Sequence, residues 1–220
     1  LQIVGGATVS LAADLPFTTI DLTDGSTAET LTLAKGYTAE TTIKMENGDK
    51  VTNTAADAVI NVTAATGHFV TGSGTSVAGS DKAGVTNTLT LLNASAATVD
   101  MSLVTNIDKL TISDYAVTSG IDVGISIANY ASAITIDTSS LDKGEDVTMS
   151  GVSAGALTFI GGGGADTVIM SSAATGDNIT TGSQKTTITA GTNISYLDTI
   201  VGGGTDTLEA TALTDVDLSN

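Results

Sequence analysis

The stretch GGGGADTVI, Gly161–Ile169, joins four consecutive glycines to an Asp-Thr-apolar triplet. Glycine permits a tight turn, whereas Thr, Val and Ile favour extended backbone, so the stretch predicts a turn that leads directly into a short strand. VGGGTDTLE at Val201–Glu209 repeats the pattern more weakly, because Val201 replaces the first glycine. LDTI at Leu197–Ile200 keeps the Asp-Thr-apolar order without glycines. The chain is therefore expected to alternate tight turns with short strands.

Short runs of Thr and apolar residues recur about every ten residues along the chain, among them TTIDL, TLTLA, AITID and ALTFI. Each run is too short to bury its apolar residues alone, whereas parallel coils of such strands bury a continuous interior and align their Thr side chains. No segment shows a sustained apolar stripe at helical spacing. These features predict an all-β fold, a parallel β-solenoid or β-helix. A β-sandwich is the alternative, because regularly spaced short strands also describe one.

The sequence also aligns with itself. ADAVINVTAATG at 56–67 matches ADTVIMSSAATG at 165–176, so that Asp57 falls on Asp166 and Gly67 on Gly176 at a constant offset. Self-similarity of this kind indicates repeated structural units. We therefore expect two diverged β repeats of about 110 residues, joined near Lys109. The first, 1–109, has degenerate turns, and the second, 110–220, carries the glycine motifs.

Acidic residues dominate the charge of the chain. The sequence holds 24 Asp and Glu against seven Lys and no Arg, and its formal net charge is −17. Such a field repels phosphate groups and anionic lipid headgroups, which argues against nucleic-acid binding, and it attracts divalent cations. Acidity alone also keeps a surface protein soluble. No Cys is present for disulfides or thiol–zinc sites, and no apolar run is long enough to span a membrane.

The glycine turns are the predicted Ca²⁺ sites. Calcium takes six to eight oxygen ligands, so turn carbonyls and carboxylates from stacked turns would share one coordination shell. The two glycine turns are about 40 residues apart, so each site is expected to take a ligand from a degenerate neighbour. Asp177 is that neighbour for the first site and Asp198 for the second. The predicted ligand set is Gly161, Gly162, Gly163, Gly164, Asp166, Gly202, Gly203, Gly204, Asp206, Asp177 and Asp198.

These residues also resemble a known family. GGGGADTVI fits the G-G-x-G-x-D nonapeptide at every fixed position. Together with LDTIVGGGTDTLEA and VTNIDKLTIS, it resembles bacterial RTX surface-layer (S-layer) proteins and related type I-secreted RTX repeat proteins. The resemblance implies RTX β-roll turns, calcium-dependent self-association into a lattice, and secretion to the bacterial cell surface. Other parts of the parent chain would then contact cell-surface polysaccharide.

Three roles remain open at this stage. The chain would be a structural segment of a surface-layer protein, a stalk repeat of a large RTX adhesin or biofilm protein, or an accessory module of a secreted enzyme. A long tandem run of nonapeptides, which would favour one of these roles, is absent from the sequence.

The chain itself is not expected to be an enzyme. Its one histidine, His68, lies in an apolar-Thr run and is interpreted as a loop or rim residue. Three Phe, four Tyr, no Trp and no Arg make a poor sugar cleft for a glycosidase. The four glycines do not form a phosphate loop, because no Lys-Ser/Thr pair follows them.

Overall fold

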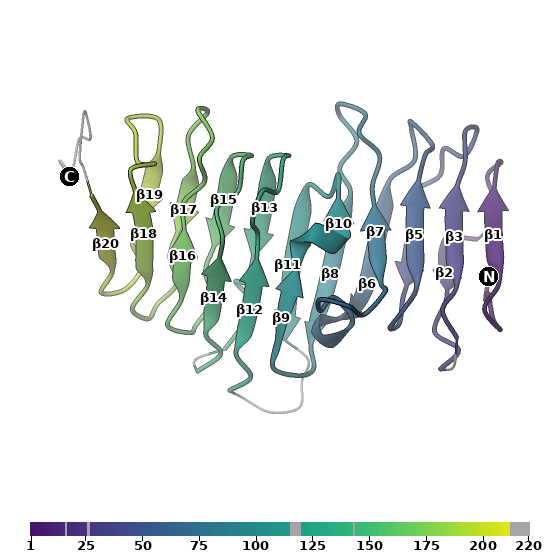
Figure 1. Ribbon diagram of the computed structural model, residues 1–220, viewed down its shortest axis with the longest axis horizontal. Helices are drawn as coiled ribbons and strands as arrows, with labels where there is room; N and C mark the ends of the chain where they lie inside the picture. The colour runs from purple at the N-terminus through teal and green to yellow at the C-terminus, as the bar shows by residue number, and fades with distance from the viewer. Residues whose placement is uncertain (16, 26, 115–119, 143, 212–220) are drawn as a thin grey trace.

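The computed structural model describes residues 1–220 except 16, 26, 115–119, 143 and 212–220. The described chain winds into a parallel β-solenoid of about nine turns, as Figure 1 shows. Every paired strand among the described residues runs parallel to its partners. The predicted β-solenoid is confirmed, and the alternative of a β-sandwich is wrong because a sandwich packs antiparallel strands.

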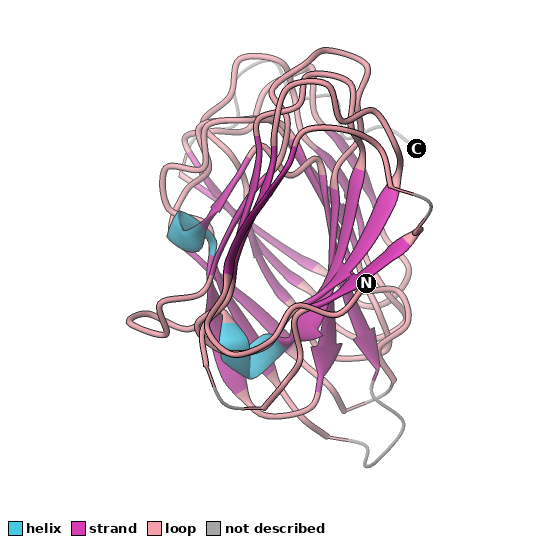
Figure 2. Cartoon of the chain, turned by 90° about the vertical axis from the view of Figure 1, so that its right-hand side faces the viewer, coloured by secondary structure: helices cyan, strands magenta, loops and turns pink. Residues whose placement is uncertain are grey.

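Two faces of short strands enclose the interior. One face is a nine-stranded sheet: β2 (Thr19–Asp21), β4 (Thr41–Lys44), β6 (Ile60–Ala65), β8 (Thr88–Asn93), β11 (Lys109–Asp114), β13 (Ile134–Asp137), β15 (Leu157–Ile160), β17 (Asn178–Thr180) and β19 (Thr199–Val201). The other face begins as a five-stranded sheet: β1 (Thr8–Leu11), β3 (Thr30–Leu33), β5 (Lys50–Asn53), β7 (Ser76–Ala78) and β10 (Val104–Thr105). It continues as a six-stranded sheet: β9 (Ala97–Asp100), β12 (Val123–Ser126), β14 (Val147–Ser150), β16 (Thr167–Ile169), β18 (Thr187–Gly191) and β20 (Thr207–Ala210). Viewed along the stack, the two faces lie opposite each other (Figure 2).

One apolar residue per turn holds the nine-stranded sheet in register. The ladder is Ile20, Ile43, Val62, Leu89, Leu110, Ile136, Phe159, Ile179 and Ile200. The first eight side chains are no more than 1% exposed, and Ile200 packs against the same core. Because side chains alternate along a strand, the residues on either side of each ladder position face outward, and many of them are Thr. The length of a turn varies along the stack. For example, fewer residues separate Ile43 from Val62 than separate Val62 from Leu89.

The second face changes sheet near the middle of the chain. Among the described strands, β9 pairs only with β12, and β10 pairs only with β7. The 3₁₀ turn η2 (Met101–Leu103) carries the chain between them. On the nine-stranded side, β11 begins at Lys109 and pairs with both β8 and β13. The expected division of the chain at Lys109 therefore coincides with no break in that sheet.

The self-alignment of the sequence joins strands of different faces. Ile60 begins β6 in the nine-stranded sheet, whereas its counterpart Ile169 ends β16 in the six-stranded sheet. The unit that the structure repeats is the single turn. Residues 212–220, at the end of the expected second copy, lie outside the described residues. The described part of the chain contains no helix with the length and hydropathy of a membrane span.

Candidate metal-binding turns

Each turn of the solenoid has two bends, one at each edge of the sheets. The bend that follows a strand of the nine-stranded sheet lies at the lower edge in Figure 1, which we call the first edge. The bend that precedes such a strand lies at the second edge. Both predicted glycine turns, 161–166 and 202–206, lie on the first edge. The bend 181–186, TGSQKT, lies between them in the stack, because β18 pairs with both β16 and β20.

The glycines of the first motif allow neighbouring bends to approach closely. A Cβ on Gly161 would lie 2.7 Å from the amide nitrogen of Gly182 in the next turn. A Cβ on Gly162 would collide with the carbonyl oxygen of Thr138 in the preceding turn. None of Gly161–Gly164 adopts a positive φ, so Gly161, Gly162 and Gly164 are required for space and not for left-handed backbone. Stacking alone therefore accounts for glycine in this bend.

Asp166 is the predicted ligand that keeps an unused oxygen. Its side chain is 2% exposed, and Oδ1 accepts a hydrogen bond from the backbone amide of Val147 at 3.0 Å. Oδ2 is buried and accepts no hydrogen bond of standard geometry, although the Gly162 amide is close enough to the carboxyl to affect its pKa. Burial, with the nearby charge of Asp146, raises the pKa of Asp166 to about 6, although the amides of Val147 and Gly162 oppose the rise. A buried carboxylate with a free oxygen suits a hard cation such as Ca²⁺.

Asp206, in the second motif, has both oxygens engaged. Oδ1 accepts from the backbone amide of Thr186 at 3.0 Å, and Oδ2 accepts from the Thr181 hydroxyl at 2.8 Å. The intervening bend carries Thr186 where the motif bends carry Asp166 and Asp206, because each of the three directly precedes a strand of the six-stranded sheet. Thr186 is fully buried, and its Oγ1 has no hydrogen-bond partner.

The structure does not bring Asp177 and Asp198 to the glycine bends. Both directly precede strands of the nine-stranded sheet, so they lie on the second edge. The pairing of Asp166 with Asp177, and of Asp206 with Asp198, is therefore corrected: each pair lies at opposite edges. Asp177 and Asp198 were chosen because they are near the glycine motifs along the sequence. Two successive bends lie at opposite edges of the solenoid, so proximity in sequence does not bring these side chains together.

Asp177 and Asp198 instead hold adjacent turns together. Asp177 accepts from the Leu157 amide at 2.8 Å, and from the Ser171 amide and hydroxyl at 2.7 and 2.6 Å. Asp198 accepts from the Asp177 amide at 2.6 Å and from the Ser195 amide at 2.5 Å. In each case a carboxylate satisfies a backbone amide of the preceding turn, which a buried bend requires. The Asp-Thr-apolar order is thus a capping pattern of the solenoid.

A group of acidic residues that the sequence did not single out lies on the first edge near the other end. Asp24, Glu29 and Glu46 each place a carboxylate oxygen within 4.8 Å of the other two. Among the described residues, no second group of three acidic or histidine side chains meets this spacing. DGSTAE and MENGD carry these acids, but only the register of β3 with β5 shows that their bends are adjacent.

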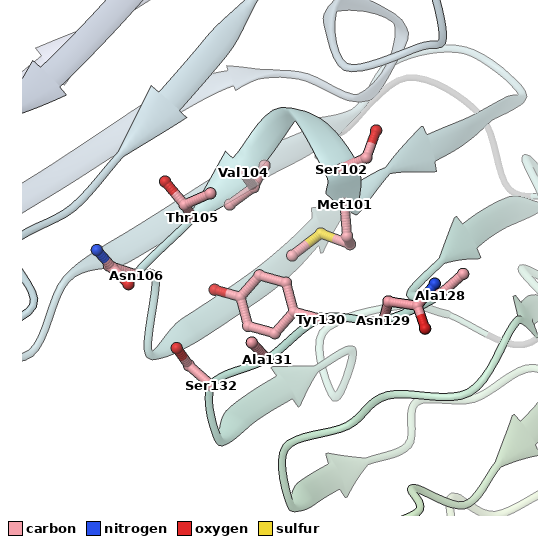
Figure 3. A pocket seen from close by; sticks show the side chains of 10 residues that line it. All are labelled: Met101, Ser102, Val104, Thr105, Asn106, Ala128, Asn129, Tyr130, Ala131 and Ser132. Atoms are coloured by element: carbon pink, nitrogen blue, oxygen red, sulfur yellow. The ribbon is translucent and has the colours of Figure 1, made fainter.

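The junction of the two sheets on the second face forms an open hollow of about 390 Å³ (Figure 3). Met101 and Tyr130 line it, together with Asn106 and Asn129, which adopt positive φ values of 52° and 60°. The Tyr130 hydroxyl donates to the Ile107 carbonyl at 2.7 Å and accepts from the Ile107 amide at 2.9 Å. Burial raises the pKa of Tyr130 to about 12. The hollow therefore presents apolar groups together with uncharged polar ones, and its phenol is already engaged.

His68 ends the 3₁₀ turn η1 (Thr66–His68) and is half-buried. It lines two hollows at the first edge, and its Nδ1 is buried without a hydrogen-bond partner. One of these hollows also borders Glu46. No acidic residue of the described chain forms an ion pair with His68.

Comparison of the chain with protein-family models, characterised proteins and solved structures finds no match. Metal binding at the bends is therefore inferred from their own geometry.

Proposed function

We propose that this chain is a structural segment of a secreted, calcium-binding surface-layer protein, in which it forms or stiffens a lattice on the bacterial cell surface. The observation that carries the proposal is the register of the nine-stranded sheet, maintained from Ile20 to Ile200. Each turn is hydrogen-bonded to the turns on both sides, and neighbouring turns share one core. Such a stack is a rigid spacer whose stability comes from nearest-neighbour contacts.

The side-chain chemistry supports a structural role over an enzymatic one. The chain has one histidine and no cysteine, which removes most nucleophile–base pairs. The hollow between the sheets is lined by Tyr130 and by uncharged side chains, and the Tyr130 phenol is engaged by Ile107. Most of the acidic residues in the bends accept backbone amides, as Asp177 and Asp198 do.

Calcium at the first glycine bend would order that part of the rod. The residues that suit the ion are Asp166, through its free Oδ2, and carbonyl groups of Gly161–Gly164. Asp206 suits it less, because Thr181 and Thr186 already donate to its two oxygens. An ion beside Asp166 would compensate a buried negative charge that otherwise has no partner for one oxygen.

Electron microscopy and calorimetry of the full chain test the proposal. With millimolar Ca²⁺ we expect ordered two-dimensional sheets, together with a rise in Tm that Asp166→Asn reduces. Single rods in place of sheets would favour the stalk of an adhesin. Globular particles without rods or sheets, or hydrolysis of a polysaccharide by the chain, would contradict a structural role. A Tm rise that Asp166→Asn leaves intact would contradict calcium binding at Asp166.

A further inference from the structure

Three acidic side chains gather on the first edge near the N-terminal end of the solenoid. Asp24 and Glu29 belong to the bend between β2 and β3, and Glu46 belongs to the bend between β4 and β5. These bends are in successive turns, because β2 pairs with β4 and β3 pairs with β5. One oxygen of each carboxylate lies within 4.8 Å of the others. Like charges at this spacing repel each other unless something between them compensates the charge.

Glu29 supplies a buried oxygen with no partner. Its side chain is 0% exposed. Oε1 accepts from the backbone amide of Gly6 at 2.7 Å and from the Thr27 hydroxyl at 3.2 Å, whereas Oε2 has no hydrogen-bond partner. No ion pair among the described residues includes Glu29. Because burial of a carboxylate without compensation is costly, Glu29 points to a cation.

Backbone amides orient the other two carboxylates. Asp24 Oδ2 accepts from the Gly5 amide at 2.7 Å. Both Glu46 oxygens accept from the Gly25 amide, at 2.8 and 3.0 Å. A carboxylate has about four lone-pair sites, so these bonds fix the side chains without exhausting their capacity to bind an ion.

Asp49 adds a fourth negative group behind the cluster. It is fully buried, and its oxygens accept from the amides of Glu29 at 2.9 Å and Glu46 at 2.8 Å. Burial raises the pKa of Asp49 to about 6, and the adjacent Glu29 carboxyl adds to the rise, first through a side-chain hydrogen bond and then through its charge. Asp49 thus supports the backbone that carries two of the three carboxylates and increases the negative potential around them.

We propose that Asp24, Glu29 and Glu46 together bind one Ca²⁺ ion that bridges two successive turns. Calcium–oxygen distances are about 2.3–2.6 Å, so two oxygens on one ion lie at most about 5 Å apart. The 4.8 Å spacing of the carboxylate oxygens meets that limit. The ion would then compensate the charge of Glu29, whose Oε2 is buried without a hydrogen-bond partner.

The ligand chemistry selects a hard cation. All three ligands are carboxylates, and His68, which lines the neighbouring hollow, is not part of the group. That hollow, about 310 Å³ and bordered by Glu46, gives water access to complete the shell. Calcium tolerates an irregular shell of six to eight oxygens, whereas Mg²⁺ demands near-ideal octahedral geometry. A site assembled from two separate bends therefore suits Ca²⁺ better.

The site shares no residue with the glycine bend at Asp166, so either site can fail without the other. The ion would join the bend after β2 to the bend after β4, as a cross-link in addition to the backbone and side-chain hydrogen bonds between these turns. Calcium would then stabilise the two ends of the rod through different ligand sets.

Calcium titration of the full chain by calorimetry, after removal of metal with EDTA, tests the site. The variants are Glu46→Gln and Asp24→Asn, each made in the Asp166→Asn background so that only the acidic site is measured. Gln at position 46 keeps an oxygen to accept from the Gly25 amide, so the fold is retained while the charge is lost. We expect Ca²⁺ binding at least tenfold weaker, and loss of the Ca²⁺-dependent rise in Tm, with Tm in EDTA little changed.

Glu40→Gln is the matched control. Glu40 lies on the second edge, directly before β4, and accepts from the Asn61 side chain at 2.8 Å. Its substitution removes the same charge from the same half of the chain and should leave Ca²⁺ affinity unchanged. Absence of Ca²⁺ binding in Asp166→Asn, or equal affinities in the Glu46→Gln and Glu40→Gln variants of that background, would overturn the acidic site. Tighter binding of Mg²⁺ than of Ca²⁺ would overturn the choice of ion.

Discussion

Two regions of the first edge use glycine for opposite reasons. Gly25, in the acidic bend near the N-terminus, has φ +82° and nothing within 4 Å of the place where a Cβ would lie. Gly162, in the glycine bend near the other end, has no positive φ but faces the carbonyl oxygens of Thr138 and Leu141. The acidic bend therefore needs glycine for backbone conformation, and the glycine bend needs it for space.

The two regions also differ in how their acids are used. Asp206, in a bend that matches the nonapeptide, already accepts two hydrogen bonds, one at each oxygen. Glu29, in a bend without the motif, is fully buried and keeps one oxygen free. Asp166, in the other bend that matches the nonapeptide, also keeps one oxygen free, so the motif alone does not decide whether a carboxylate retains an oxygen for a cation.

The largest expected effect separates the two uses of glycine. Gly162→Ala should destabilise the chain by about 3 kcal/mol, because its Cβ collides with backbone of the preceding turn, which cannot move without shifting a whole coil. Gly25→Ala should cost only about 1 kcal/mol, the cost of a left-handed φ for Ala in open space. Urea unfolding monitored by circular dichroism measures both. Equal costs at the two positions would contradict the distinction.

Loss of metal from a single site should have the next largest effect. At a Ca²⁺ concentration of about 100 times the dissociation constant, each site adds about 2.7 kcal/mol to the free energy of unfolding. EDTA should remove the contribution of both regions. Asp166→Asn should remove one and Asp24→Asn the other, and the two losses should add because the sites share no ligand. Thermal unfolding with and without Ca²⁺ measures them. A single variant that abolishes the whole shift would contradict two independent sites.

The sequence predicted the architecture well because every turn of the solenoid repeats the same pattern of short Thr-apolar strands and bends. A Thr-apolar run each half turn gives a strand with one side chain in the core, as Ile136 and Phe159 show. The number of residues in each turn was harder to predict from the sequence. Turns vary in length, and strands of both faces share one composition, so an alignment of the sequence with itself can join strands of different faces, as it does for Ile60 and Ile169.

The candidate sites were less predictable, because they depend on which bends are neighbours. Asp166 was singled out from its motif, and its Oδ2 is buried without a hydrogen-bond partner, but calcium binding there stays a prediction. Asp177 was assigned to the same site, but it lies at the other edge and accepts three hydrogen bonds. Glu29 and Glu46 were missed because they lie in separate segments of the sequence, and only strand register brings them together.

Without metal, in EDTA, the free energy of unfolding should depend on pH through Asp166. Its folded pKa of about 6 exceeds the unfolded value near 3.8, so the folded state holds the proton more tightly. This stabilising contribution is complete below about pH 4 and is lost as pH rises through 6, a change of about 2 kcal/mol. Asp166→Asn should flatten that fall, which thermal unfolding from pH 4 to 7 measures. Calcium should bind more weakly at pH 5 than at pH 7, because protons compete for the carboxylate.

The smallest expected effect lies in the bend between the two glycine motifs. Thr186 is buried with its Oγ1 unpartnered, so Thr186→Val replaces a hydroxyl that has no hydrogen bond with a methyl group of similar size. We expect a change in unfolding free energy between zero and about 1 kcal/mol in the stabilising direction. Thr181→Val is the matched control, because the Thr181 hydroxyl donates to Asp206 at 2.8 Å and accepts from the Gly203 amide at 2.8 Å. That variant leaves two groups without partners and should be destabilised by about 2 kcal/mol. Urea unfolding of both variants in EDTA measures the two changes in unfolding free energy. If Thr186→Val destabilises the chain as much as Thr181→Val, the Thr186 hydroxyl makes a hydrogen bond in the folded state, which would contradict this prediction.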